Sequence, residues 1–469
     1  MHKRGSHSGG SQRIIALACA IVVAACGCGR DGLPSSEDIR SSDATEGVLG
    51  LLDMADDESM LAPIDAPVRD ATNTCFDHAL DGDETDVDCG GSCASCALLK
   101  GCRVNADCQT TSCVHRHCVP ATLLTLGFAT PVQSGAGSMP DAIAAADLNG
   151  DGIDDVAVAN FGGNTVSVLL GSSTGLGVAV NFPCGQNPAA VQIADIDGDT
   201  RLDILTANSG GTGSVGVLVN KGFGAFQAAS AIPAGGALTS IAIGDLNNDG
   251  RLDVVATTAN DVSVVTNLGS MKFSSPVFFP SGESSRSPSI GDFNGDGNLD
   301  VAAANSDGTT GNSISVLLGD GHGGLTPSTT YPVDRRPMAL GCADFNGDGL
   351  LDLASANFAG NDITMLANSG SGRFGPFGNV TVGAQPQGIA VGDLNLDGWP
   401  DLVVTNYLDN TISLLINSGT GTLHNVSNLA TGNGPLGVVV ADVNGDGKPD
   451  IIATAAQSGT VTTFLNTSQ

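Results

Sequence analysis

An acidic loop of nine residues recurs seven times along this chain, and successive copies begin 47 to 52 residues apart. The first copy reads Asp147-Leu-Asn149-Gly-Asp151-Gly-Ile153-Asp-Asp155. Every copy has Asp at positions 1, 5 and 9 and Asn or Asp at position 3, and six copies have Gly at position 6. A fixed period of this length means that one supersecondary unit is built seven times, so the chain must fold as a repeat architecture. The other copies begin at Asp195, Asp245, Asp292, Asp344, Asp393 and Asp442.

The residue types in these loops indicate a calcium ligand. Ca²⁺ takes six to eight oxygen ligands, and alternate residues of a tight loop can direct their oxygens at one point. Positions 1, 3, 5 and 9 offer side-chain oxygens, and position 7, which varies, offers a backbone carbonyl. The alternative is a set of plain hairpin turns, but a hairpin needs two turn residues rather than four spaced polar ones. We therefore predict up to seven Ca²⁺ ions as cofactors.

The predicted ligands are, loop by loop, Asp147, Asn149, Asp151, Ile153 and Asp155; Asp195, Asp197, Asp199, Arg201 and Asp203; Asp245, Asn247, Asp249, Arg251 and Asp253; Asp292, Asn294, Asp296, Asn298 and Asp300; Asp344, Asn346, Asp348, Leu350 and Asp352; Asp393, Asn395, Asp397, Trp399 and Asp401; and Asp442, Asn444, Asp446, Lys448 and Asp450. The second loop lacks the Gly at position 6 and has an additional acid, Asp197.

Each repeat also carries the pattern of four short strands. Residues 387–392 lead into an acidic loop, residues 401–405 leave it, and residues 411–416 and a looser segment follow. Four strands in a period of about 40–50 residues are typical of a β-propeller blade. The segments that leave the loops are nearly continuous apolar runs, which predicts burial on both faces. The expected fold is all-β, a seven-bladed β-propeller.

The two ends of the repeat region predict how the ring closes. After the seventh loop the chain has only two more strand-like segments, the last ending at Leu465. Before the first loop, residues 124–132 resemble an isolated fourth strand. We expect this segment to complete the last blade, which removes two free sheet edges.

These loops resemble FG-GAP or VCBS repeats, which form the propeller heads of integrin α subunits and occur in many bacterial surface proteins. The resemblance covers about residues 121–469, within a predicted propeller domain of residues 119–469, and includes an Asn after the second strand of most repeats. It implies the propeller fold and calcium at the five loop positions assigned above. It does not specify one function, because the family includes adhesins, lectin-like modules and domains attached to enzymes. The Asn residues are Asn160, Asn208, Asn305, Asn357 and Asn406.

The N-terminal region reads as an export signal followed by a tether. A basic start and an apolar stretch over residues 14–25 predict a signal peptide, residues 1–25. The apolar stretch is too short to span a bilayer. Val23-Ala-Ala-Cys26 resembles a lipobox, which implies lipidation at Cys26. Ordinary signal-peptide cleavage, giving a secreted protein, is the alternative. Residues 26–74 are polar and acidic, as expected of a flexible tether.

Residues 75–118 form a candidate disulfide module. Eight cysteines in a short exported segment favour a disulfide framework, and zinc is the less favoured alternative because only one Cys-x-x-Cys pair is present. The segment resembles short cysteine-rich modules of myxobacterial surface proteins. The cysteines are Cys75, Cys89, Cys93, Cys96, Cys102, Cys108, Cys113 and Cys118.

The charge and the composition exclude some classes of function. A net charge of −31 argues against a nucleic-acid partner. The repeat region has only two histidines, His322 and His424, in different repeats, and no catalytic constellation. We therefore predict a non-enzymatic adhesion or binding module, displayed as an outer-membrane or cell-surface lipoprotein, with a protein or glycan ligand and membrane contact only through the lipid. A lectin-like propeller is a weaker alternative, and a calcium-dependent polysaccharide lyase or hydrolase is weaker still.

The predicted ligand-binding face is the one opposite the acidic loops. Turns there carry paired asparagines at 160 and 164, 357 and 361, and 406 and 410. Asn in tight turns also commonly bonds to the backbone itself, so a purely structural role is the competing interpretation.

Overall fold

The computed structural model describes residues 113–114, 117–118, 126–306, 312–327 and 329–468. The predicted signal peptide, the lipidation site Cys26, the tether and the first six cysteines of the disulfide module lie outside these residues. Within residues 75–118 the structure describes only two short antiparallel strands, β1 (Cys113–Val114) and β2 (His117–Cys118).

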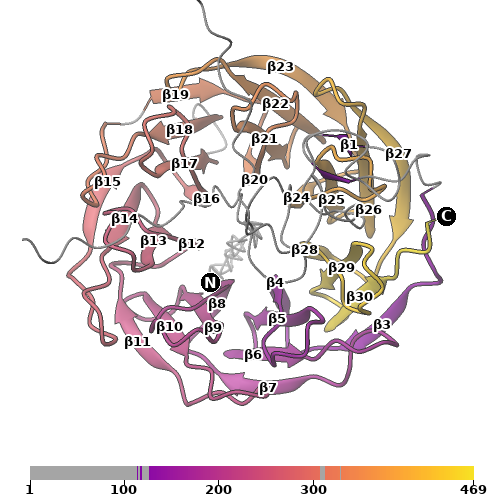
Figure 1. The fold of residues 1–469 in the computed structure, drawn as a ribbon, viewed down its shortest axis with the longest axis horizontal. Coiled ribbons are helices and arrows are strands. Elements are labelled where there is room, and N and C mark those ends of the chain that lie inside the picture. The colour runs from indigo at the N-terminus through magenta and orange to yellow at the C-terminus, as the bar shows by residue number, and fades with distance from the viewer. Residues whose placement is uncertain (1–112, 115–116, 119–125, 307–311, 328, 469) are drawn as a thin grey trace, which may run out of the picture.

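The rest of the described chain forms seven four-stranded antiparallel sheets arranged as blades around one axis (Figure 1). We number the blades by the acidic loop that each contains. The first strands lie nearest the axis: β4 (Pro140–Ala146), β8 (Pro188–Ala194), β12 (Ser240–Gly244), β16 (Ser285–Gly291), β20 (Pro337–Ala343), β24 (Pro386–Gly392) and β28 (Pro435–Ala441). The second strands are β5 (Asp155–Asn160), β9 (Asp203–Asn208), β13 (Asp253–Thr257), β17 (Asp300–Asn305), β21 (Asp352–Asn357), β25 (Asp401–Asn406) and β29 (Asp450–Ala455).

The third and fourth strands complete each blade toward the rim (Figure 1). The third strands are β6 (Thr165–Leu169), β10 (Ser214–Leu218), β14 (Asp261–Val265), β18 (Ser313–Leu317), β22 (Asp362–Asn368), β26 (Thr411–Asn417) and β30 (Thr460–Phe464). The fourth strands are β7 (Val180–Pro183), β11 (Ser230–Pro233), β15 (Val277–Pro280), β19 (Thr329–Pro332), β23 (Phe374–Thr381), β27 (Leu423–Ala430) and, in blade 7, β3 (Val132–Gly135). The predicted seven-bladed propeller is confirmed.

Ring closure by the N-terminal strand is also confirmed. β3 pairs antiparallel with β30, with Val132 opposite Thr463 and Gly135 opposite Thr460. Just before β3, Phe128 forms an isolated bridge with Asn466, and its ring meets that of Phe464 edge-on at 6.5 Å. The first described strand of the propeller and the last therefore belong to one blade.

Burial follows the predicted pattern. Every residue of the second strands is buried, as their apolar runs predict for strands covered on both faces. The innermost strands need small residues because blades converge there. A Cβ placed on Gly341 would lie 2.8 Å from Ile389 of the next blade, and one on Gly392 would lie 2.7 Å from Val440. Among the described residues, no helix has the length and apolar character to cross a membrane.

Candidate metal centre

All seven acidic loops lie on one face of the propeller, between the first and second strand of each blade. Position 1 directly follows a first strand, and position 9 is the first residue of the second strand, as with Asp155 in β5. Because the strands alternate in direction, the turns between third and fourth strands share this face. The loops therefore form a circle of acidic groups around the axis.

The carboxylate at position 1 organises each loop. In loop 1, Asp147 Oδ1 accepts hydrogen bonds from the backbone N–H groups of Gly150 and Asp151, at 2.6 and 3.2 Å. Its Oδ2 accepts one from the N–H of position 6, and this bond recurs in all seven loops at 2.7–2.8 Å. Burial acts to raise the pKa of Asp147, but the backbone N–H donors outweigh it and lower the pKa overall.

Positions 3 and 5 lie close together in the same loops. Asp151 Oδ1 accepts a hydrogen bond from the N–H of Ile153 at 2.9 Å, and its Oδ2 accepts one from Asn149 Nδ2 at 3.0 Å. The structure thus brings positions 1, 3 and 5 to the inside of one turn, as the spacing predicts.

The carboxylate at position 9 has a role that the sequence did not indicate. Asp155 is fully buried, and both its oxygens accept backbone hydrogen bonds. One bond comes from Leu148 at position 2 and the other from Gly171 just after the third strand, at 3.0 and 2.7 Å. All seven loops repeat these two hydrogen bonds. The position 9 residue, which begins the second strand, is therefore also joined to position 2 of its acidic loop and to the end of the third strand. Each oxygen retains a second lone pair that a cation could use.

Burial raises the pKa of these position 9 carboxyls. The pKa is raised to about 6 for Asp155, about 8 for Asp401 and about 7 for Asp450, because desolvation disfavours the charged form. The other acids of each loop raise it further. A divalent cation would relieve both effects.

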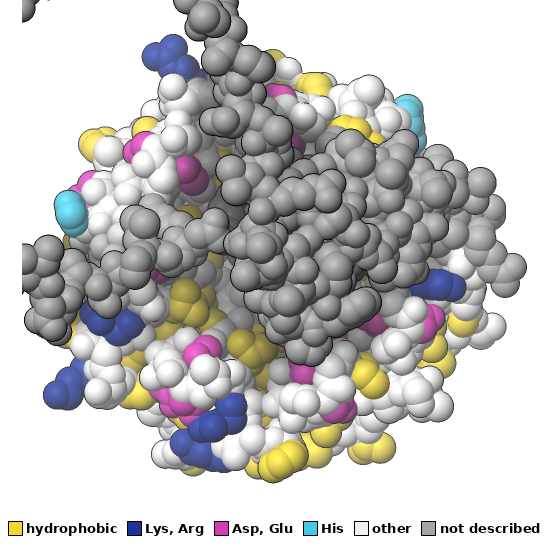
Figure 2. All heavy atoms as spheres, in the orientation of Figure 1, with side chains coloured by type: hydrophobic (Ala, Val, Ile, Leu, Met, Phe, Trp, Pro, Cys, Tyr) yellow, Lys and Arg dark blue, Asp and Glu magenta, His cyan; other side chains and the backbone are white. Residues whose placement is uncertain are grey.

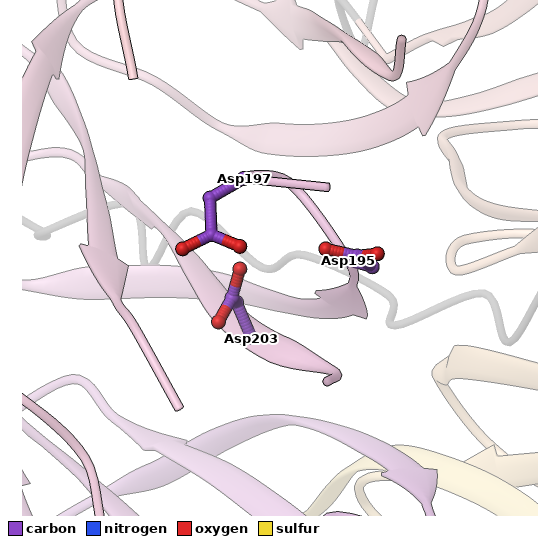
Figure 3. A group of neighbouring side chains, drawn as sticks. All are labelled: Asp195, Asp197 and Asp203. Atoms are coloured by element: carbon purple, nitrogen blue, oxygen red, sulfur yellow. The ribbon is translucent and has the colours of Figure 1, made fainter. Parts of the chain in front are cut away.

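Loop 2 gathers the densest group of carboxylates among the described residues. Oxygens of Asp195, Asp197 and Asp203 all lie within 4.8 Å of one another (Figure 3). Asp197 stands at position 3, where the other loops have Asn, and it points toward Asp203. The additional acid that distinguishes this loop in the sequence therefore lies where a ligand is needed.

Two loops have an internal competitor for a metal. At position 7, Arg201 and Arg251 form ion pairs with the position 5 carboxylates Asp199 and Asp249. Each guanidinium also donates through Nε to a carbonyl after the third strand, at 3.1 Å for Arg201 and 2.9 Å for Arg251. The sequence predicts that position 7 contributes its backbone carbonyl and that its side chain is free to vary. In loops 2 and 3 that side chain instead pairs with the position 5 carboxylate of the predicted ligand set.

Every loop is also fastened to the next blade through the carbonyl of position 2. In five cases the donor is Nδ2 of a buried Asn that is the last residue of a third strand or lies two residues after it, at 2.8–2.9 Å. The same Nδ2 bonds to the position 8 carbonyl of its own loop at 2.9–3.2 Å. In blades 1 and 4, which have Gly at that site, the backbone N–H groups of Ser172 and Gly323 donate instead. We call the five side chains the clamp asparagines: Asn220, Asn267, Asn368, Asn417 and Asn466.

The asparagines on the opposite face are structural. Asn160 and Asn406 are fully buried, and their Nδ2 atoms donate to Ser167 and Ser413 of their own blades at 2.8 and 2.9 Å. Asn164 adopts a left-handed backbone conformation, and its Oδ1 accepts the N–H of Asn187 in the next blade at 2.8 Å. Asn361 and Asn410 repeat this bond. The competing interpretation from the sequence is therefore the better one for these turns.

A family model described as an FG-GAP-like repeat matches six overlapping segments of the chain: residues 147–206, 195–256, 245–303, 292–355, 344–404 and 393–453. Together these segments run from residue 147 to residue 453 of the 469, which is more than half of the chain. The chain belongs to the FG-GAP-like repeat family.

Solved structures resemble this FG-GAP-like repeat protein in fold alone. BBS1N, in a complex with ARL6DN, superimposes with a TM-score of 0.52 at 12% identity, covering 73% of this chain and 98% of that one. Hydrazine synthase of Kuenenia stuttgartiensis gives a TM-score of 0.52 at 15% identity, covering 72% of this chain and 98% of that one. No curated protein matches significantly.

Proposed function

We propose that this protein is a calcium-binding, non-enzymatic propeller that serves as an adhesion or binding module at the cell surface. The observation that carries the calcium proposal is the repetition of one loop geometry, in which the same position 1 carboxylate is held by the same N–H donor in all seven loops. A plain turn does not require three acids at constant spacing.

The donor set fits calcium and fits softer metals poorly. Positions 1, 3, 5 and 9 are Asp or Asn throughout, so each loop offers carboxylate and amide oxygens with no Cys or His. Oxygen-only sets favour hard cations such as Ca²⁺. In loop 1 the ion would be held by Asp147, Asn149, Asp151, Asp155 and the carbonyl of Ile153. Its charge would neutralise a circle of acids and stabilise the fold.

Measuring calcium stoichiometry tests this proposal. Equilibrium dialysis against Ca²⁺ should give up to seven bound ions per chain, with the lowest affinity in loops 2 and 3, where arginines pair with position 5. Asp442→Asn, at position 1 of loop 7, should remove one ion. The matched control Glu283→Gln changes an exposed acid outside the loops and should remove none. A chain that binds no calcium at millimolar concentration overturns the proposal.

The proposal that this protein is a binding module rests on its fold and on the absence of a catalytic grouping among the sequence motifs. BBS1N, a protein of similar fold, was solved in a complex with another protein, ARL6DN. On the uncovered part of the face in Figure 2, Asp and Glu side chains lie in several places, and Lys and Arg side chains lie around the rim. The turn asparagines opposite the acidic loops form hydrogen bonds within the propeller. A ligand on that face would therefore contact exposed neighbours such as Leu408. A glycan array, with an unrelated calcium-loaded propeller as control, separates this function from the lectin-like alternative.

We further propose that Cys26 carries a lipid that displays the propeller on the outer membrane or cell surface, with residues 27–74 as spacer. Metabolic labelling with a fatty-acid analogue should label the wild type and not Cys26→Ser. Mass spectrometry of the mature N-terminus gives the second readout. An unlipidated mature N-terminus makes the protein a secreted propeller and leaves the calcium proposal unaffected.

A further inference from the structure

Seven residues occupy corresponding positions near the start of the innermost strands, at the end of the axis opposite the acidic loops. Each lies six residues before position 1 of its acidic loop; in six blades it is the second residue of the first strand, and in blade 3 it is Thr239, directly before the shorter β12. Register supports the equivalence, because Pro140, Ser285 and Pro386, which precede three of them, each pair with the Asn that ends the second strand. We call this set the axial ring: Asp141, Ala189, Thr239, Arg286, Met338, Gln387 and Leu436.

Members of the axial ring from non-adjacent blades are linked near the axis. Met338 of blade 5 and Leu436 of blade 7 belong to one buried apolar cluster, against which Tyr407 of the intervening blade 6 packs. Asp141 of blade 1 and Arg286 of blade 4 influence each other's pKa by their charges, although two blades separate them on the shorter side of the ring.

Three of the four polar members of the axial ring have unsatisfied atoms. Within the described part of the chain, both oxygens of Asp141, Nη1 of Arg286 and Oε1 of Gln387 are buried and have no hydrogen-bond partner. The fourth, Thr239, is bonded through Oγ1 to Thr257 and to the carbonyl of Ser285. Asp141 is 1% exposed, Arg286 6% and Gln387 7%. Polar groups buried without a partner are rare in native proteins, and an unpaired buried charge is costly. Arg286 Nε donates to the carbonyl of Ser284 at 3.4 Å, but among the described residues neither Asp141 nor Arg286 has an ion-pair partner.

A hollow of about 430 Å³ opens beside the axial ring. Leu436 lines it together with Met139, Tyr407 and Gln457, so it has both apolar and polar walls. Small-molecule sites commonly have this size and this mixture of walls.

We propose that the axial ring binds a small zwitterion of the α-amino-acid class. Its carboxylate would pair with Arg286, its ammonium group with Asp141, and Gln387 Oε1 would accept a further N–H. An apolar side chain would lie on Met338 and Leu436 and extend toward the hollow. A ligand with a single charge leaves one of the two buried charges unpaired, which is the reason for this choice of class. Burial raises the pKa of Asp141 and lowers that of Arg286 to about 10, as expected for charged groups without a counter-ion.

Calorimetric titration of the full chain, in calcium buffer, with three probes tests this inference. L-leucine carries both charges, 4-methylpentanoate lacks the ammonium group, and 3-methylbutylamine lacks the carboxylate. We expect leucine to bind at least tenfold more tightly than either analogue. The absence of leucine binding, or equal binding of one analogue, overturns the proposal.

Variants of Asp141 and Arg286 test which residue pairs with each charge of the ligand. Asp141→Asn should remove the preference for leucine over 4-methylpentanoate, and Arg286→Met the preference over 3-methylbutylamine. Arg335→Met, which changes an exposed arginine outside the axial ring, should leave both preferences unchanged. If the ring variants do not fold, the three-probe comparison on the wild type still decides. The site lies on the face away from the acidic loops, so its failure and a failure of calcium binding are separate results.

Discussion

Asn417 Nδ2 in blade 6 donates a hydrogen bond of 2.8 Å to the carbonyl of Phe345, which lies 72 residues earlier in acidic loop 5. The same nitrogen donates to the carbonyl of Pro400 in its own loop at 3.2 Å. One amide therefore links two neighbouring acidic loops. Asn417 and Phe345 are both buried, so the carbonyl of Phe345 cannot turn to water if the amide is removed.

We predict that Asn417→Ala lowers the free energy of unfolding by about 1–3 kcal/mol, because the buried carbonyl of Phe345 loses its partner. Urea unfolding in calcium-free buffer measures this separately from metal binding. Asn425→Ala, an exposed amide in β27 of the same blade, is the control and should change stability by less than about 0.5 kcal/mol. Equal effects of the two substitutions would show that the clamp contributes nothing specific.

Calcium removal should lower the melting temperature. Extracellular sites commonly have dissociation constants of about 0.1–1 mM, so at about 1 mM calcium a site with a constant of about 0.1 mM contributes roughly 1.4 kcal/mol. Several such sites together approach the net stability of a whole domain. Thermal melts with calcium and with excess EGTA give the comparison, and magnesium at the same concentration is the control. An unchanged midpoint would exclude a structural role for the ion.

The pH dependence of the calcium-free protein follows from the position 9 carboxyls. Their folded pKa values, about 6 for Asp155 and about 8 for Asp401, lie above the unfolded value of about 3.9, with burial as the main cause. The folded state therefore binds more protons than the unfolded state. The stabilisation from these protonated carboxyls is complete below about pH 4 and is lost as pH rises through about 6 to 8.

In metal-free buffer we thus expect the melting temperature to fall between pH 5 and pH 8. Millimolar calcium should reduce or reverse the fall, because the cation takes the place of the protons. Asp401→Asn cannot titrate and should flatten the metal-free profile at its upper end. A melting temperature that rises over this range without metal would contradict the assignment.

Removal of β3 should open the ring. Deleting residues 126–137 leaves the outer edge of β30 without its partner and takes away the contact between Phe128 and Phe464. Exposed strand edges promote association, so we expect oligomers by light scattering and an earlier melt. Val132→Ser, which changes an exposed side chain but keeps the strand, is the control. A deletion variant that remains monomeric and melts like the parent would show that closure is dispensable.

Much of the fold could be read from the sequence because the repeat is strict. Seven loops at one spacing define seven blades, and the short seventh repeat predicted that β3 would complete it. The positions of Asp147, Asn149 and Asp151 inside one turn followed from alternate spacing alone. These features depend on local order along the chain, which is what a sequence shows directly.

The clamp asparagines could not be predicted in this way, because they depend on which blade lies beside which loop. The arginine pairs depend on the side-chain conformation of position 7 within its own loop, which the spacing does not give. A signal for the clamp existed, since Asn220, Asn267 and Asn417 lie in the same register at the ends of their third strands, but it gave no indication of the partner. The turn asparagines were also ambiguous. Asn164 could face a ligand or accept a backbone N–H, and only the position of Asn187 in the next blade decides between them.

The pairing of β3 with β30 sets an order of events during biosynthesis. β3 is made before every other strand of the described propeller and β30 after them, so a nascent chain that has not yet released β30 cannot have a complete ring. Contacts between such distant segments are slow to form. The edges of the unfinished blade consequently stay unpaired until β30 has been made, and chaperones have the most to protect during that interval.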